Sequence, residues 1–439
     1  MKKHIIRSAL ALAMMMTVLP VSADIGCAYS VSAAQSAKTS DYVTIAGEKY
    51  SISETRSLDL QKHNLKNEDI KEIGKLKNLT KLNLADNYIS DLTPLAELTN
   101  LTELDLTYNA MSDITPLAKL TNLTNLNLSD NHKSDLTPLA KLTKLTHLTM
   151  ENTSASDITP LAKLTNLTEL NLTLNQISDL KPLGKLTKLT KLDLHWNPIT
   201  DITPLAKLTN LTDLNLQGNH ISNITPLAKL TKLTELNLNH NQISEIKPLT
   251  KLTNLTKLDL SWNQISDIKP IAKLTKLKKL DLYANKISDI KPLAKLTKLT
   301  ELNLYHNQIS DIKPLAKLTN LTALDLSVNN ISDIKPLANL TKLTCLVLSL
   351  NFYIKDITPL AKLTNLTELN LSENQISDIK PLTKLTKLTS LDLSANQISD
   401  IKPLEKLKNL TGLNLVGNPI SDSDMKWLKK QLKDTKITY

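Results

Sequence analysis

Apolar and polar positions repeat along this chain with a period of 22 residues. A representative copy, Leu255 to Lys276, reads LTKLDLSWNQISDIKPIAKLTK, and its first nine residues fit L-x-x-L-x-L-x-x-N. The leucine in the middle of this motif recurs from Leu82 to Leu413, with one extra residue inserted near Phe352. A self-similarity of this period indicates a solenoid, in which each unit buries its apolar side against its neighbours.

The motif predicts how each unit folds. In Leu258-Asp259-Leu260 successive side chains alternate, so both leucines point into the solenoid and Asp259 points out. Strands from successive units then pair in parallel at about 4.8 Å. Pro270 ends the strand pattern and turns the chain to the outer side. We therefore predict an α/β solenoid that is curved and right-handed, with a parallel inner β-sheet, an irregular or 3-10 convex side and terminal caps.

One asparagine per unit is predicted to turn inward and form hydrogen bonds with backbone groups of the loop. A buried amide is costly unless it is paired, which explains why the position varies so little between units. Thr153 replaces the asparagine in one unit, where we expect a weaker ladder. The predicted ladder consists of Asn87, Asn109, Asn131, Asn175, Asn197, Asn219, Asn241, Asn263, Asn285, Asn307, Asn329, Asn351, Asn374, Asn396 and Asn418.

The repeat motif, its length and the recurring N-Q-I-S-D-I-x-P-L tail resemble the leucine-rich repeats of the internalin family of Gram-positive bacteria. The resemblance covers roughly Leu58 to Leu415. It implies an exported leucine-rich repeat protein that binds a partner through its concave face. The chain shows no immunoglobulin-like domain, sorting signal or wall-binding module, so we expect the secreted type without a wall anchor. Internalins usually carry a helical N-terminal cap, and the sequence predicts none here.

Residues 1–23 are typical of a secretory signal peptide. Lys2, Lys3 and Arg7 precede an apolar run that is too short to span a membrane, and Val21-Ser22-Ala23 fits a cleavage site. Cleavage after Ala33 is an alternative. Ile25-Gly26-Cys27 resembles a lipoprotein box, but Asp24 stands where an aliphatic residue is expected, which disfavours lipidation. We expect a secreted protein, alternatively one loosely associated with the cell surface.

The remaining segments lead into the array and close it. Residues 24–41 are predicted to be a flexible tether. Residues 42–57 are predicted to form a β-hairpin cap that pairs with the first irregular repeat around Leu58. The array extends over residues 58–422. In the C-terminal cap, residues 423–439, Ser423 is the expected N-cap of a helix that presents Met425, Leu428 and Leu432 on one face.

Information for recognition must lie where copies differ while facing solvent, mainly on the inner sheet. The chain has few aromatic residues, and two of its three tryptophans fall in these columns. From His195 to His306 is five repeats, about 24 Å, which is the width of a protein contact patch rich in hot-spot residues. The alternative is drift between duplicated units. The predicted partner-binding residues are Trp196, Trp262, Tyr283, Tyr305, His195, His240, His306 and Tyr108.

The formal net charge of +10 is unevenly distributed. The inner columns carry many aspartates and glutamates, so the lysine excess must belong to the outer segments. These lysines are spread at repeat spacing without arginine or interleaved aromatics, which argues against nucleic acid as a partner. They favour a solvated convex face, or retention on anionic wall polymers or cell-surface polysaccharide.

Catalytic and metal-binding patterns are not found. The chain has no phosphate-binding loop, nucleophile elbow or zinc-binding H-E-x-x-H helix. The histidines at 195, 240 and 306 lie about 10–14 Å apart, too far to converge on one zinc ion. Cys345 has no histidine on its own or adjacent strands. We therefore expect a monomeric, non-enzymatic binding module without cofactor or metal, whose partner is a protein such as a host surface receptor. The alternative is an adhesin for carbohydrate or anionic wall polymer.

Overall fold

The computed structural model describes residues 41–132 and 135–439, which form a leucine-rich repeat solenoid with an open parallel sheet. A separate hairpin, β1 (Tyr42–Ile45) and β2 (Glu48–Ser51), precedes it. Each strand of the sheet has three residues and pairs in register with the next, Leu on Leu except at the last pair, where Leu413 lies beside Ile437. The strands are β3 (Ser57–Asp59), β4 (Lys81–Asn83), β5 (Glu103–Asp105), β6 (Asn125–Asn127), β7 (His147–Thr149), β8 (Glu169–Asn171), β9 (Lys191–Asp193), β10 (Asp213–Asn215), β11 (Glu235–Asn237), β12 (Lys257–Asp259), β13 (Lys279–Asp281), β14 (Glu301–Asn303), β15 (Ala323–Asp325), β16 (Cys345–Val347), β17 (Glu368–Asn370), β18 (Ser390–Asp392), β19 (Gly412–Asn414) and β20 (Lys436–Thr438).

The return segments are five-residue 3-10 helices, each with a proline in its first turn and, except before η8, an aspartate or asparagine two residues upstream. Before η9, for example, the Asp267 carboxylate accepts the N–H of Lys269 at 2.9 Å, and Pro270 occupies a first-turn position. The helices are η1 (Thr93–Glu97), η2 (Thr115–Lys119), η3 (Thr137–Lys141), η4 (Thr159–Lys163), η5 (Lys181–Lys185), η6 (Thr203–Lys207), η7 (Thr225–Lys229), η8 (Lys247–Lys251), η9 (Lys269–Lys273), η10 (Lys291–Lys295), η11 (Lys313–Lys317), η12 (Lys335–Asn339), η13 (Thr358–Lys362), η14 (Lys380–Lys384) and η15 (Lys402–Lys406).

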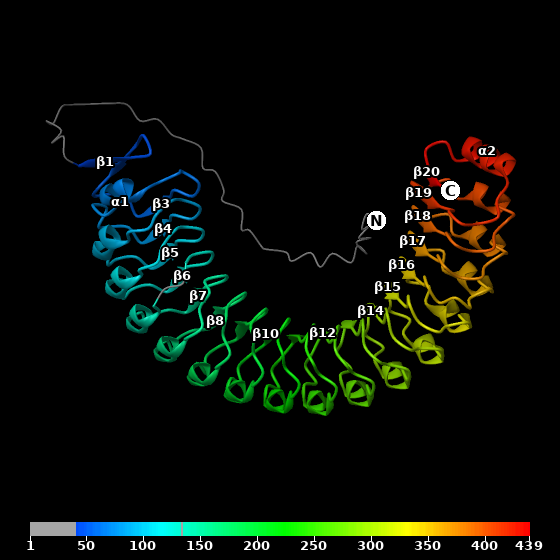
Figure 1. The fold of residues 1–439 in the computed structure, drawn as a ribbon, viewed down its shortest axis with the longest axis horizontal. Coiled ribbons are helices and arrows are strands. Elements are labelled where there is room, and N and C mark those ends of the chain that lie inside the picture. The colour runs from blue at the N-terminus through cyan, green and yellow to red at the C-terminus, as the bar shows by residue number, and fades with distance from the viewer. Residues whose placement is uncertain (1–40, 133–134) are drawn as a thin grey trace. The chain divides into compact units, whose positions relative to one another are not determined.

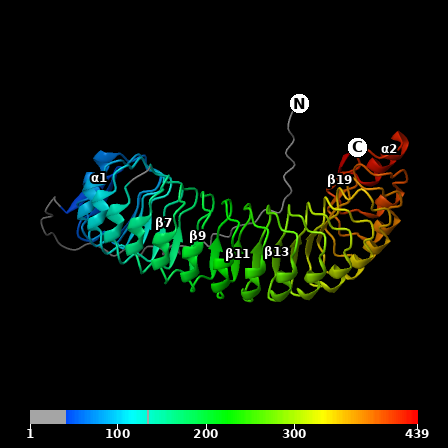
Figure 2. The same ribbon diagram turned by 60° about the horizontal axis from the view of Figure 1, so that its bottom comes forward.

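Within the repeat array the strands line the concave side and the 3-10 helices line the convex side (Figure 1). Figure 2 shows the 3-10 helices stacked beside one another along that outer side. A continuous core of leucine and isoleucine lies between the two layers, and Leu258, Leu260 and Ile271 are at most 2% exposed. Because every repeat buries the same positions, burial of apolar surface is shared evenly along the array.

The asparagine ladder lies along one edge of the core. The Asn285 amide donates to the carbonyls of Leu260, Leu282 and Tyr283 at 2.9–3.2 Å, and its oxygen accepts the N–H of Ile265 at 2.9 Å. One side chain thus binds backbone groups of two successive repeats. This arrangement pairs four backbone groups that would otherwise lack a partner and links neighbouring repeats.

The ladder is interrupted at irregular repeats. The Thr153 hydroxyl makes one long bond to a carbonyl, that of Met150 at 3.4 Å, where an asparagine would make three. The same hydroxyl and the Thr153 N–H also donate to the Asn175 side-chain oxygen. Among the described residues, the buried Oδ1 atoms of Asn131 and Asn374 have no hydrogen-bond partner. Asn374 follows the inserted residue near Phe352, which shifts the loop that would otherwise supply its donor.

The N-terminal end departs from the predicted arrangement. The hairpin β1–β2 does not pair with β3 and forms its own antiparallel sheet, so the predicted pairing with the strand around Leu58 is wrong. It packs instead against α1 (Asn67–Ile73), a short helix that the sequence reading did not include. Val43 and Ile45 enter the core from the hairpin, at 3% and 1% exposed. The alternating apolar positions of the strand therefore find their burial on a helix.

At the C-terminal end, the helix α2 (Asp422–Gln431) begins two residues earlier than expected. Ser421, not Ser423, is its N-cap, and the Ser421 hydroxyl accepts the N–H of Asp424 at 3.1 Å. Met425, Leu428 and Leu432 are buried. The last strand, β20, extends the sheet by pairing with β19.

The signal peptide, most of the tether and Cys27 lie outside the described residues. In the described part of the chain, no helix is long and apolar enough to cross a membrane.

Candidate functional site: an aromatic belt on the concave face

Each repeat presents four side chains to the concave side at fixed positions. Two flank the buried leucine of the strand, such as Lys257 and Asp259 around Leu258 in β12. Two follow at the end of the strand, Ser261 and Trp262 in the same repeat. We call the last of these positions the exit column. Because strands are stacked in register, residues at one position in successive repeats are direct neighbours across the sheet.

The backbone at the exit column is left-handed in every repeat. The φ angle is +53° at Trp196, +55° at His240 and +51° at Trp262. This conformation costs a bulky L-residue about 1 kcal/mol, and the repeat imposes it because the following asparagine must turn into the core. It also aims the exit side chain outward along the rim of the sheet. Trp196 and Trp262 are accordingly 43% and 51% exposed.

Six rings form an unbroken series of contacts on this surface, which we call the aromatic belt: Trp196, His240, Trp262, Tyr283, Tyr305 and His306. Ring centroids lie 5.3 Å apart for Trp196 and His240, 6.1 Å for His240 and Trp262, and 5.3 Å for Trp262 and Tyr283. Tyr283 and Tyr305 are stacked at 4.6 Å. These separations are those of favourable aromatic pairs, so the rings hold one another in place without a ligand.

Gly218 makes the first of these contacts possible. It occupies the exit column between Trp196 and His240, at φ +66°, and a Cβ placed there would be 2.5 Å from the Trp196 ring. The indole therefore lies directly over the glycine and reaches a histidine two repeats away. A surface hollow of about 450 Å³ adjoins the contact between the indole and the glycine. It is lined by Trp196, Pro198, Gly218, His220, His240 and Gln242. Sequence reasoning missed Gly218, although a glycine in a column of bulky residues was a usable signal.

Two predicted site residues lie apart from the belt. His195 is 23% exposed at its side chain and is held by Asp193 Oδ1 at 2.6 Å and the Thr173 hydroxyl at 3.0 Å. It belongs to the polar network of the sheet. Tyr108 is 63% exposed and lies four repeats before Trp196, and no ring contact connects it to another described residue.

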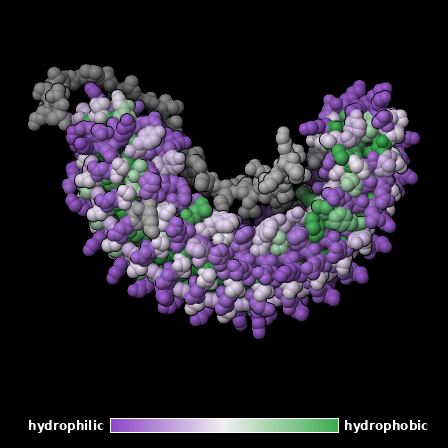
Figure 3. All heavy atoms as spheres, viewed as in Figure 1, coloured by the Kyte–Doolittle hydropathy of each residue, from purple (hydrophilic) through white to green (hydrophobic). Residues whose placement is uncertain are grey.

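The exit column holds no aspartate, glutamate, lysine or arginine over ten successive repeats around the belt, and carries acids on both sides of this run. Asp86, Asp130 and Glu373 are the flanking acids. Beyond His306 the run continues into an apolar patch at β15 and β16 that sequence reasoning missed, made by Val328, Val347, Leu350, Phe352 and Tyr353. Figure 3 shows hydrophobic residues gathered at the concave edge near these strands. Phe352, the single phenylalanine of the chain, is 51% exposed because the inserted residue displaces the loop outward.

Aspartates line the sheet beside the belt, and they are less exposed than alternation predicts. Asp259 and Asp281 face each other on β12 and β13, and both are half-buried. The Ser261 hydroxyl and N–H donate to Asp259, and the Tyr283 N–H donates to Asp281 at 2.9 Å. Burial raises the pKa of Asp259, and burial followed by the charge of Asp259 raises the pKa of Asp281 to about 7.

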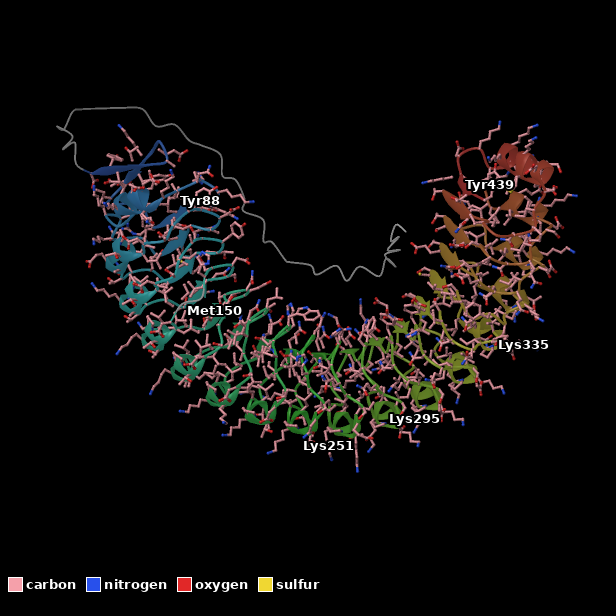
Figure 4. All side chains as sticks on the ribbon, viewed as in Figure 1. Tyr88, Met150, Lys251, Lys295, Lys335 and Tyr439 are labelled. Carbon is pink, nitrogen blue, oxygen red and sulfur yellow. The ribbon has the colours of Figure 1, made fainter. Side chains whose placement is uncertain are left out.

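The lysines of the inner sheet do not neutralise this pair. Lys257 binds Glu235 on β11 at 2.6 Å, and Lys279 binds Glu301 on β14 at 2.7 Å. Each lysine therefore turns away from the two aspartates toward the strand that flanks the pair. Other lysines lie on the convex side, where Lys251, Lys295 and Lys335 point away from the array (Figure 4). The lysines of the 3-10 helices and the aspartates beside the belt therefore lie on opposite sides of the solenoid.

The described residues contain no group of histidine, cysteine, aspartate and glutamate that could hold a metal ion. Cys345 is half-buried on β16, and burial together with Glu368 raises the pKa of its thiol to about 11. The neutral thiol is a poor nucleophile.

The comparisons with known proteins agree with this architecture. The sequence matches the family described as leucine-rich repeats (2 copies) at residues 99–141, 165–207, 193–229, 209–251, 231–273, 253–295, 275–317, 297–339, 319–362, 364–406 and 386–430. No curated protein sequence matches significantly.

Three solved structures illustrate the likeness. An internalin, InlF of Listeria monocytogenes, is 38% identical over 73% of this chain and 88% of its own, with a TM-score of 0.64. A leucine-rich repeat protein of Leptospira interrogans is 29% identical over 80% and 99%, with a TM-score of 0.73. The functional domain of InlJ from Listeria monocytogenes, which includes a cysteine ladder, is 26% identical over 84% and 75%, with a TM-score of 0.64. On this evidence the chain belongs to the leucine-rich repeat family and is an internalin-like member of it.

Proposed function

We propose that this protein is an exported, non-enzymatic, monomeric module that binds a protein partner, such as a host surface receptor, through the aromatic belt. The observation that carries the proposal is the unbroken series of ring contacts from Trp196 to His306 on an exposed concave surface. A few residues supply most of the binding energy at protein interfaces, and tryptophan and tyrosine are enriched among them. Proteins of this repeat class are binding scaffolds, and curved solenoids offer their concave surface to partners.

The belt is suited to this role because its rings are already ordered. Binding normally loses free energy when side chains become fixed, and rings held by their neighbours lose less. The left-handed backbone at Trp196, His240 and Trp262 fixes the direction of each side chain in advance. The neighbouring apolar patch at Leu350 and Phe352 extends the surface by further repeats and enlarges the area that a folded partner could cover.

The test is capture of a partner from solubilised host-cell surface proteins by the full chain. The belt variant changes Trp196, Trp262, Tyr283 and Tyr305 to Ser. A matched control changes four exposed tyrosines outside the belt, Tyr42, Tyr88, Tyr108 and Tyr439, to Ser. We expect a protein that is retained by the wild type and by the control, and lost by the belt variant. Equal retention by all three proteins would contradict the proposal.

The second candidate is an adhesin for carbohydrate or anionic wall polymer, and the convex lysines favour it. Most 3-10 helices end in lysine, as at Lys251 and Lys295, so positive charges recur along the outer side at the spacing of the repeats. Such binding depends on ionic strength, because salt screens exposed charges within about 10 Å at 0.1 M. Retention on teichoic acid that falls steeply with salt and is unchanged in the belt variant would support this candidate.

A further inference from the structure

The aromatic belt lies beside carboxylates that have no basic partner among the described residues, and this combination indicates the chemistry of what binds there. Asp259 and Asp281 are direct neighbours on the adjacent strands β12 and β13. Trp262 and Tyr283, which follow the same two strands, are in ring contact. Among the described residues neither aspartate forms an ion pair, since Lys257 and Lys279 are bound to glutamates on the flanking strands β11 and β14. Two like charges side by side are unfavourable, and a cation placed between them would relieve the repulsion.

The hydrogen bonds of the two aspartates leave acceptor capacity on their carboxylate oxygens for such a cation. Asp281 accepts the Tyr283 N–H and, at 3.1 Å, the side-chain amide of Asn303. Asp259 receives both of its donors, from Ser261, on Oδ1, and no bond to Oδ2 from a described residue is present. Asp325 continues the acidic column one strand beyond Asn303. The aspartates of the concave sheet are therefore half-buried beside the rings, and Asp259 Oδ2 can accept a donor from a partner.

We propose that the partner of the belt offers a basic side chain, arginine or lysine, which lies against the rings of Trp262 and Tyr283 and pairs with Asp259 and Asp281. This inference rests on the proposed function and names the chemistry of the partner segment. Aromatic faces attract cations, and arginine stacks on them while its planar donors match carboxylates. The charge complementarity is local, because the chain as a whole carries a formal net charge of +10. Non-specific attraction would select an acidic partner.

The experiment titrates the full chain with octa-arginine and, separately, with octa-glutamate, following tryptophan fluorescence. Trp427→Phe is introduced throughout so that only Trp196 and Trp262 report. The test variant is Asp259→Asn with Asp281→Asn, in which the amide oxygens can still accept the bonds from Ser261 and Tyr283. The control is Asp392→Asn, because Asp392 lies in the same column, accepts the N–H and hydroxyl of Ser394 and binds Asn414, with no belt ring beside it.

We expect octa-arginine to change the fluorescence and the double variant to weaken its binding by about tenfold, as loss of charge-assisted hydrogen bonds predicts. Asp392→Asn should alter binding less than twofold. The inference is overturned if octa-arginine does not bind, if the double variant binds it equally well, if Asp392→Asn weakens it to the same extent, or if octa-glutamate binds more tightly.

The same variant separates this inference from the proposed function. If the protein captured from host-cell surfaces is lost by the belt variant and retained by Asp259→Asn with Asp281→Asn, the belt binds a partner but the basic contact is wrong. If the captured protein is retained by the belt variant, the proposed function itself fails. Circular dichroism melting of each variant verifies that the array is folded, and the conservative Asn substitutions leave the core leucines untouched.

Discussion

The repeats of β9–β14 and those of β17–β19 share one backbone and present different surfaces. In both regions the leucine core is buried, the exit residue is left-handed, and an asparagine closes the loop. In the first region the exit column holds four rings together with Gly218 and Ala284, and two aspartates face each other on β12 and β13. In the second it holds Glu373, Ala395 and Gly417, and Asp392 is flanked by Asn370 and Asn414. The comparison teaches that the scaffold is uniform and that neighbours across the sheet decide the surface chemistry.

The largest expected effect tests whether the scaffold is uniform. Asn285→Ala and Asn396→Ala should each lower the free energy of unfolding by roughly 2–4 kcal/mol, because each leaves several buried backbone groups unpaired. Both asparagines form three donor bonds and one acceptor bond with equivalent partners. Urea unfolding followed by circular dichroism measures the loss.

Asn374→Ala is the matched comparison for those two substitutions. The Asn374 oxygen has no donor, so its replacement should cost about 1 kcal/mol less. A loss as large as that of Asn285→Ala would mean that the oxygen contributes nothing at the other positions.

The next effect concerns the facing aspartates and has a defined pH dependence. The pKa of Asp281 is raised from near 4 to about 7, so the folded state binds more protons than the unfolded state between these values. The free energy of unfolding should therefore fall as pH rises from about 4 to about 7, with part of the change due to Asp259 and Asp325, whose pKa values are also raised. Aspartates with lowered pKa, such as Asp91 bound to Thr93, contribute only below about pH 4.

Asp281→Asn should remove most of this dependence and stabilise the fold at pH 8 by on the order of 1–3 kcal/mol. Asp392→Asn, with asparagine neighbours on both strands, should not stabilise it. Melting temperatures of the wild type and both variants at pH 5 and pH 8 provide the comparison. A wild type that is more stable at pH 8 than at pH 5, with Asp281→Asn unchanged relative to it, would contradict the explanation.

A smaller effect compares the two glycines of the exit column. Gly218→Ala and Gly417→Ala each place a Cβ on a left-handed backbone, at a cost of about 1 kcal/mol. At Gly218 the new Cβ also meets the Trp196 ring at 2.5 Å, whereas at Gly417 the nearest atom is 3.4 Å away. We expect Gly218→Ala alone to displace the indole and shift the fluorescence of Trp196, measured with Trp262 and Trp427 replaced by Phe. Identical spectra for both variants would show that the position of the Trp196 ring does not depend on the glycine at 218.

The smallest effect is the coupling within the belt. Tyr283 and Tyr305 are stacked, and a double-mutant cycle with Leu at both positions should give a coupling of about 0.5–1.5 kcal/mol in unfolding free energy. The same cycle at Tyr88 and Tyr108, which are exposed and not in ring contact, should give a value near zero. Equal coupling in the two pairs would remove the evidence that the belt is ordered before binding.

The repeating pattern by itself determined the solenoid, the columns and the core. A 22-residue period with leucine at fixed phases leaves one way to bury every apolar side chain, and the buried asparagine has one way to satisfy its amide. The concave location of Trp196, Trp262, Tyr283 and Tyr305 followed from the same period. These features depend on residues that are close together in the sequence or one repeat apart. Their spacing can be read from the sequence directly.

Only the tertiary structure decided features that depend on how neighbouring units fit together. The indole of Trp196 lies over Gly218 and contacts His240, because the glycine leaves space for the ring. Lys257 pairs with Glu235 because of the side-chain geometry across adjacent strands. The hairpin β1–β2 packs on α1, and Ser421 replaces Ser423 as the N-cap, because burial and loop geometry at the ends follow no period. Local pattern determines which residues share a surface, and three-dimensional packing determines which of them touch.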